Sequence, residues 1–151
     1  MSLHLSTGLR NALLGTGDWK TLFTDGIMNI YSGSPPASAD DVETGVLLVS
    51  ITVASGAFVA GSPDNGLEFD TPAIGVLSKN GYTWSGVGLV TGEAGYYRFY
   101  DNFYEAGASG TAIRFDGTCA VTGGDLSMID LTVTSMLTTT VNTFYVTLPA
   151  E

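Results

Sequence analysis

The sequence has few of the residues that catalytic and metal-binding sites commonly use. Its 151 residues include one cysteine, Cys119, and one histidine, His4. A single cysteine excludes a disulfide within the chain and a zinc site built from cysteines alone. A single histidine leaves no histidine–acid pair to activate a nucleophile and no histidine pair for zinc. We therefore expect neither an enzyme nor a bound cofactor.

Charged residues are also scarce, at 13% of the chain, which is roughly half the share of an average soluble protein. Five basic residues stand against fifteen acidic ones, for a net charge of −10. This charge repels phosphate backbones and anionic lipid headgroups, and the scattered basic residues form no stripe that could follow a nucleic acid strand. The sequence predicts no nucleic acid partner and no membrane partner.

Hydrophobic residues, by contrast, make up 44% of the chain. One explanation of this composition is that the protein hides apolar surface in a large core or against other subunits. The alternative explanation is that uncharged serine, threonine, glycine and asparagine take the place of charged residues at the surface. Residues 1–14 contain no apolar run of the length that a signal peptide or a membrane span requires. We expect folding in a cytoplasm.

Helical spacing is confined to the N-terminal segment, residues 1–26. Apolar residues between Leu5 and Leu14 recur at helical intervals after Ser6, a suitable N-cap. Asp18 then precedes a second short apolar pattern, which Gly26 ends. The sequence predicts a helical arm over residues 1–26, followed by a β domain over residues 27–151, within a single globular domain.

From residue 27 onward the apolar pattern has the period of β-strands, and Asn80-Gly81 is a strong hairpin signal because both residues tolerate positive φ. The many glycines, and the lack of a helix long enough to cross a parallel sheet, predict an all-β fold, an antiparallel β-sandwich or jelly roll with a short helical N-terminal segment. The predicted strands cover residues 27–31, 46–53, 67–69, 73–78, 82–90, 95–100, 111–115, 126–133 and 143–148.

Acidic residues give only weak signals for a site. The loop with Asp40, Asp41 and Glu43 and the turn around Asp64-Asn65 offer oxygen atoms to calcium, but no twelve-residue ligand loop is present. The turn residues are explained by backbone geometry alone. Glu68 with Asp70, and Asp101 with Glu105, are formal carboxylate pairs for a glycosidase, which spacing alone does not support. We expect no metal site and no catalytic residues.

The segment 82–104 is the most informative part of the chain, because it is rich in aromatic residues. In a strand, Tyr97 and Phe99 face one way while Tyr96, Arg98 and Tyr100 face the other, so both faces need cover. A second sheet, a neighbouring subunit or a sugar stacked on the tryptophan could supply it. The candidate interface residues are Leu9, Leu13, Trp19, Trp84, Tyr96, Arg98, Tyr100, Phe103 and Tyr104.

The C-terminal third contains many threonines, which favour strands and an uncharged surface. An uncharged β edge is an aggregation hazard in a monomer, and it becomes useful when the edge pairs with another chain. Together with the aromatic segment, this pattern indicates a protein that assembles with others, and we expect a homo-oligomer.

Several short motifs resemble those of small structural proteins encoded by tailed bacteriophages, and they are spread over nearly the whole chain. They are Leu9-Arg10-Asn11-Ala12-Leu13-Leu14-Gly15, Asp25-Gly26, Ile30-Tyr31-Ser32-Gly33, Gly45-Val46-Leu47-Leu48, Trp84-Ser85-Gly86-Val87-Gly88, Ala94-Gly95-Tyr96-Tyr97-Arg98-Phe99 and Thr147-Leu148-Pro149-Ala150.

Head decoration, or cement, proteins of phages are the best match in size and expected fold. The resemblance implies a virion protein, assembled in the host cytoplasm, that stabilises the head through contacts with the major capsid protein or other virion proteins. It carries no catalytic motif. A tail, collar or fibre-associated subunit is the alternative within the virion, and a carbohydrate-binding sandwich that stacks sugars on Trp84 is the alternative outside it.

Overall fold

The fold begins with two short helices whose first residues are set by side-chain caps. Helix α1, Thr7–Gly15, follows Ser6, whose Oγ accepts a hydrogen bond from the Leu9 N–H at 3.1 Å. Helix α2, Trp19–Leu22, follows Asp18, whose carboxylate accepts one from the Thr21 N–H at 3.0 Å. Each cap satisfies an N–H group that the first helical turn leaves unpaired. The computed structural model describes residues 2–150, and both predicted helices are confirmed.

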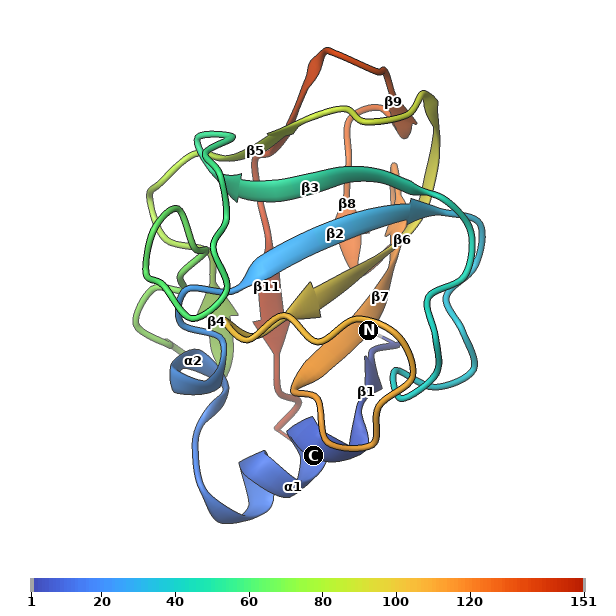
Figure 1. Ribbon diagram of the computed structural model, residues 1–151. Coiled ribbons are helices and arrows are strands. Elements are labelled where there is room, and N and C mark those ends of the chain that lie inside the picture. Colours follow the sequence, from blue (N-terminus) through green and yellow to red (C-terminus); the bar gives the residue numbers. More distant parts are fainter. Residues whose placement is uncertain (1, 151) are drawn as a thin grey trace.

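A twisted sheet with the strand order β1-β7-β6-β2-β3-β5-β10 forms the centre of the molecule (Figure 1). Its pairs are antiparallel; β9 also pairs with β6, and β8 joins β7 in parallel. A separate two-stranded sheet contains β4 and β11. The strands are β1 His4–Leu5, β2 Ile27–Ser32, β3 Leu47–Val53, β4 Val76–Ser78, β5 Trp84–Val87, β6 Gly92–Tyr100, β7 Arg114–Ala120, β8 Leu126–Ser127, β9 Thr132–Val133, β10 Thr138–Val141 and β11 Tyr145–Thr147.

This architecture confirms the predicted all-β class, with mainly antiparallel pairing and a sandwich-like arrangement of two sheets. The β4–β11 sheet packs across the inner face of the main sheet, and Figure 1 shows β11 running steeply behind β2 and β3. The jelly-roll topology stays a prediction.

Aromatic rings fill the space between the two sheets. Phe99 of β6 lies at the centre, with its ring centroid 5.4 Å from that of Phe23 and 5.5 Å from those of Phe69 and Phe115. Phe144, next to β11, closes the cluster from the second sheet, 6.1 Å from Phe99. Rings at these separations add to the free energy of apolar burial. The core is therefore built largely from aromatic contacts between elements that are distant in sequence.

The N-terminal segment contributes to this same core. Leu9 of α1 and Phe23 after α2 are fully buried, and Trp19 is 9% exposed. Trp19 packs edge-on against Phe115 at 5.0 Å. In the described residues, the helices thus form one end of the globular body (Figure 1).

The predicted hairpin at Asn80-Gly81 is wrong. The strands on either side, β4 and β5, pair with β11 and with β3 and β10, and not with each other. The Asn80 Oδ1 instead accepts a hydrogen bond from the Tyr82 N–H at 3.2 Å. The hairpin turn lies at Ile74-Gly75, where φ is 53° and 73° and the flanking residues exchange two backbone hydrogen bonds of 2.9 Å. Positive φ at both central residues is the geometry of a type I′ turn.

Other predicted strands have different limits. Strand β7 begins at Arg114 and continues beyond the predicted end, because Gly117 in its middle makes room for the ring of Tyr97 on β6. The predicted strand 126–133 is divided into β8 and β9, which pair with different neighbours. Residues 67–69 form only isolated bridges. Strands β1 and β10 were not among the predicted strands.

The turn residue Ile74 provides a test of backbone strain. Its side chain is fully exposed, and its φ of 53° is unfavourable for a β-branched residue. Because asparagine tolerates this conformation, we expect Ile74→Asn to raise the free energy of unfolding by about 1 kcal/mol. Urea unfolding measures the change. The control is Ile129→Asn, at a position that is 87% exposed with φ outside the positive range; an equal effect of both substitutions would contradict the strain argument.

Candidate functional site

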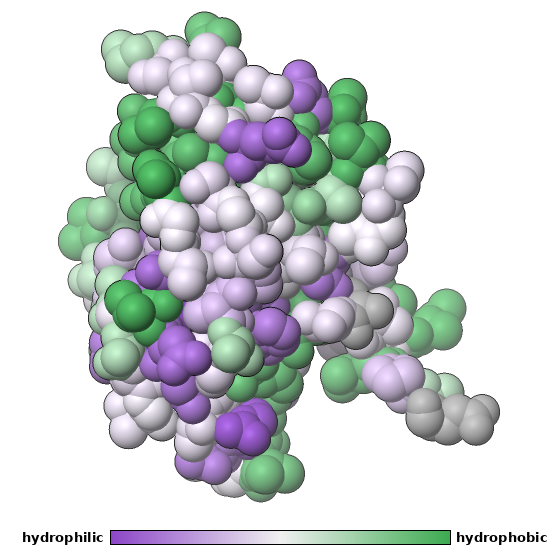
Figure 2. Space-filling model, turned by 90° about the vertical axis from the view of Figure 1, so that its right-hand side faces the viewer, coloured by the Kyte–Doolittle hydropathy of each residue, from purple (hydrophilic) through white to green (hydrophobic). Residues whose placement is uncertain are grey.

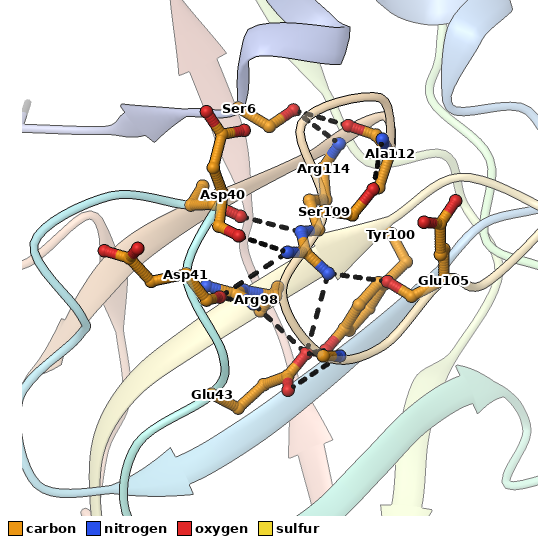
Figure 3. A network of polar contacts seen from close by, with 12 residues as sticks. Ser6, Asp40, Asp41, Glu43, Arg98, Tyr100, Glu105, Ser109, Ala112 and Arg114 are labelled. Carbon is orange, nitrogen blue, oxygen red and sulfur yellow. Dashed lines mark hydrogen bonds and ion pairs between the residues drawn. The ribbon is translucent and has the colours of Figure 1, made fainter.

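The face of β7, β6 and β2 that points away from the aromatic core carries a buried polar network. Two loops of the chain cover it: residues 33–46, between β2 and β3, and residues 101–113, between β6 and β7 (Figure 3). Two fully buried arginines, Arg98 and Arg114, project from the sheet into this network. Both faces of the aromatic strand are therefore covered by the protein itself.

Arg98 forms the centre of the ionic contacts. Its Nη2 donates to Asp116 Oδ2 at 2.9 Å while its Nε donates to the other oxygen, so the pair is bidentate. Its Nη1 reaches Glu43 Oε1 at 3.1 Å and the Asp41 carbonyl at 2.9 Å. Paired donors and acceptors of this kind compensate for the loss of water around buried charges. This arginine joins β6, β7 and the first loop.

Arg114 makes its contacts mainly with main-chain oxygens of the two covering loops. Its Nε donates to the Ala39 carbonyl at 2.7 Å and its Nη2 to that of Asp40 at 3.2 Å. Its Nη1 donates to the Glu105 carbonyl at 2.7 Å. One guanidinium group thus anchors both loops to β7.

Glu43 joins the first loop to the second. Its Oε1 accepts from the Tyr100 hydroxyl at 2.6 Å, and its Oε2 accepts from the Gly107 N–H at 3.0 Å. Burial acts to raise the pKa of Glu43, but these hydrogen bonds and the charge of Arg98 outweigh burial and hold the pKa below its ordinary value. The carboxylate is therefore ionised at neutral pH and serves as a structural acceptor.

The acidic residues considered for metal binding are engaged within the protein. Asp40 accepts hydrogen bonds from the N–H and hydroxyl of Thr7, at 2.7 and 2.6 Å. Asp41 accepts from the Ser38 N–H at 3.1 Å. Asn65 occupies its turn with a φ of 58°. Within residues 2–150, no group of three or more histidine, cysteine or acidic side chains is arranged to hold a metal ion.

The remaining reactive groups lie in separate places. Asp101 is buried, and burial raises its pKa, whereas Glu105 is exposed. Cys119 is buried in the core, which raises the pKa of its thiol to about 12 and keeps it protonated at neutral pH.

The structure places most of the nine predicted interface residues inside the chain. Leu13 is packed against the core, Trp19 is largely buried, Tyr104 is half-buried, and Phe103 is 78% exposed. The exposure of Phe103 agrees with its predicted role, which itself stays a prediction. The other five are fully buried and are not available at the surface of this chain: Leu9, Trp84, Tyr96, Arg98 and Tyr100.

An exposed apolar surface lies elsewhere, at the end of the sheet where β5 and β10 meet. We call it the apolar corner and define it as Val87, Leu89, Val90, Met136 and Leu137. Their side chains are between 44% and 81% exposed. Figure 2 shows apolar side chains at the upper end of the molecule, where β9 and the turn before β10 lie in Figure 1. Exposed apolar groups that gather in this way mark interaction sites.

Backbone hydrogen bonds hold the two loops of the apolar corner together. The Gly88 N–H donates to the Leu137 carbonyl at 2.8 Å, and the Met136 N–H donates to the Gly88 carbonyl at 2.9 Å. The Leu89 N–H is bound to the Leu48 carbonyl of β3 at 2.7 Å. Met136 has a φ of 68°, which holds its side chain outward at a cost in backbone energy. The corner is therefore ordered before any partner binds.

The strands next to the apolar corner lack charge. Residues 44–63, 80–92 and 131–150 contain no ionisable acidic or basic side chain apart from tyrosine hydroxyls, and they supply β3, β5 and β10, which are neighbours in the sheet. Among residues 2–150, β5 is the one strand that pairs with β10, so the outer edge of β10 is open within this part of the chain. It has no lysine, proline or bulge of the kind that protects edges. The feature of the sequence that could have indicated the apolar corner was the length of these runs without charged residues.

Comparisons of the chain with models of protein families, with curated proteins and with solved structures found no match. None of the helices in the described residues has both the length and the hydropathy needed to cross a bilayer.

Proposed function

We propose that this protein is a structural subunit of a tailed-bacteriophage particle, acting as a head decoration protein that binds the major capsid protein. The observation that carries the proposal is the apolar corner, an ordered surface without charges beside an open strand edge. The resemblance of several sequence motifs to those of small phage structural proteins supports the virion assignment.

The chemistry of the apolar corner suits stable protein contact. Burying its side chains against a partner removes apolar surface from water, and no charge on its two loops has to be desolvated. Its backbone order lowers the entropy that is lost on binding. The open edge of β10 offers a second copy a place to pair, which supports a homo-oligomeric unit. The carbohydrate-binding alternative requires an exposed Trp84, whereas this side chain is fully buried.

The test is binding of the purified protein to phage heads that lack it. We expect the double substitution Val87→Lys, Leu137→Lys to weaken binding by at least about tenfold, because each ammonium group would be buried against an apolar partner. Cosedimentation with the heads measures the affinity. The control is Leu14→Lys, at an 88% exposed position on α1. Binding of the double variant equal to that of the control would contradict the role of the corner.

Labelled protein on intact particles separates a head position from the tail alternative. A decoration protein labels the whole head surface in many copies. A tail, collar or fibre subunit labels few copies at one vertex, and this result would move the assignment to that part of the virion while the corner remained the binding surface.

A further inference from the structure

A groove separate from the apolar corner runs along the C-terminal strand β11. It has a volume of about 1010 Å³ and lies between β11 on one side and the N-terminal segment with the turn before β8 on the other. Leu3, Leu5, Trp19, Phe144 and Val146 give it apolar walls. The opposite wall is fixed by Asp125, whose carboxylate accepts hydrogen bonds from the N–H groups of Ser2 and Thr118, both at 2.9 Å.

The strand that borders the groove has an open hydrogen-bonding edge. Strand β11 pairs with β4 through alternate residues: the Lys79 N–H donates to the Phe144 carbonyl and the Leu148 N–H donates to the Gly75 carbonyl, each at 2.9 Å. In an antiparallel pair, the residues between these direct their N–H and C=O groups to the opposite edge. The backbone groups of Tyr145 and Thr147 therefore point away from β4, and the described residues offer them no partner.

Trp19 adds an unsatisfied donor at the same place. It lines both the groove and a smaller apolar pocket of about 200 Å³ beside it, which Pro72 and Leu77 help to form. Its Nε1 is buried and has no acceptor among the described residues. A buried donor without an acceptor is costly, and a main-chain carbonyl brought by an occupant would relieve that cost.

The charge of the walls restricts the occupant. Apart from the Tyr145 hydroxyl, Asp125 has the one acidic or basic side chain among the described residues that line the groove, and the chain as a whole has a net charge of −10. A segment with aspartate or glutamate side chains would be repelled, whereas a neutral or basic segment would not. With the open edge, this favours an extended peptide whose alternate side chains are apolar.

We propose that the groove binds an extended segment of a partner protein, neutral or basic and apolar at alternate positions, which adds as a strand to β11. The added strand pairs with the main chain of Tyr145 and Thr147 and places its inward side chains beside Trp19. The proposal does not depend on the virion assignment or on the apolar corner.

The test uses a display library of random eight-residue segments, selected on the intact protein and on the Thr147→Pro variant. Proline removes the N–H that faces the groove, and it is tolerated at an open strand edge. We expect the intact protein to enrich segments with alternate apolar residues and without acidic ones, and the variant to lose this enrichment. No enrichment over the variant, or enrichment of acidic segments, would overturn the proposal.

Two further measurements keep the result independent of how well the proline variant folds. A selected peptide should slow hydrogen exchange of the Tyr145 and Thr147 amides at least tenfold in the intact protein. The same peptide with N-methyl groups on the residues that face β11 should bind at least tenfold more weakly. Unchanged exchange at these two amides, or equal binding of the methylated peptide, would show that no strand is added.

Discussion

Replacing Arg98 with methionine is expected to lower the free energy of unfolding by roughly 3–5 kcal/mol, as found when one partner of a buried ion pair is removed. The side chain has no exposure, and its loss leaves Asp116 fully buried, with no ion-pair partner among the residues that the structure describes. Glu43 loses its closest cation in the same step. Methionine keeps the apolar volume, so the loss reports the charge and its hydrogen bonds.

Urea unfolding followed by circular dichroism measures this effect. The matched control is Arg10→Met on α1, an exposed arginine whose guanidinium donates a hydrogen bond to the Thr7 hydroxyl, and its expected effect lies within about 0.5 kcal/mol. The double variant Arg98→Met, Asp116→Leu removes the stranded carboxylate and should recover much of the stability. An Arg98→Met variant as stable as the Arg10→Met variant would mean that the network contributes nothing.

Replacing Phe99 with alanine is expected to cost about 3–5 kcal/mol of unfolding free energy, because it opens a cavity that the rigid sheets cannot close. Phe99 is fully buried and contacts rings from both sheets and from the helical segment. The substitution therefore weakens the contacts between all three parts at once.

The control for this prediction is Phe103→Ala, four residues further along the chain. Phe103 is 78% exposed, so its truncation should change the unfolding free energy by no more than about 0.5 kcal/mol. Thermal and urea unfolding of the two variants give the comparison. An equal loss of unfolding free energy in the two variants would contradict the placement of Phe99 in the core and Phe103 at the surface.

The helices could be predicted from sequence because their signals are local. Ser6 and Asp18 cap the helices that follow them, and both caps depend on residues within one turn. The hairpin at Asn80-Gly81 could not be judged in this way. Its turn residues are suitable, but strand pairing is decided by β11 and β3, which lie far away in sequence.

The role of the aromatic segment shows the same limit. Alternation correctly placed Tyr97 and Phe99 on one face and Arg98 on the other. The face of β6 that contains Arg98 is covered by loops that Glu43 and Arg114 hold in place. Glu43 lies 55 residues before Arg98 and Arg114 lies 16 residues after it, so no local sequence pattern reveals these contacts. Five of the nine predicted interface residues are therefore side chains that the chain itself buries.

The apolar corner was missed because its residues resemble core residues. Val87 and Leu89 belong to the predicted strand 82–90, but β5 ends at Val87 and the residues that follow are exposed at the surface. Met136 and Leu137 lie between β9 and β10, in a part of the chain for which no strand was predicted. Which apolar residues remain exposed is decided by the ends of strands, the least reliable feature of a sequence-based assignment.

The way in which Arg114 holds the covering loops has a consequence for how this protein can change. Arg114 donates hydrogen bonds to the main-chain carbonyls of Ala39, Asp40 and Glu105, and every amino acid has such a carbonyl. The outward side chains of Asp41 and Glu105 are exposed and are not what arginine recognises. Substitutions at outward positions such as Glu105 can therefore change the surface of these loops while the main-chain contacts with Arg114 are inherited unchanged.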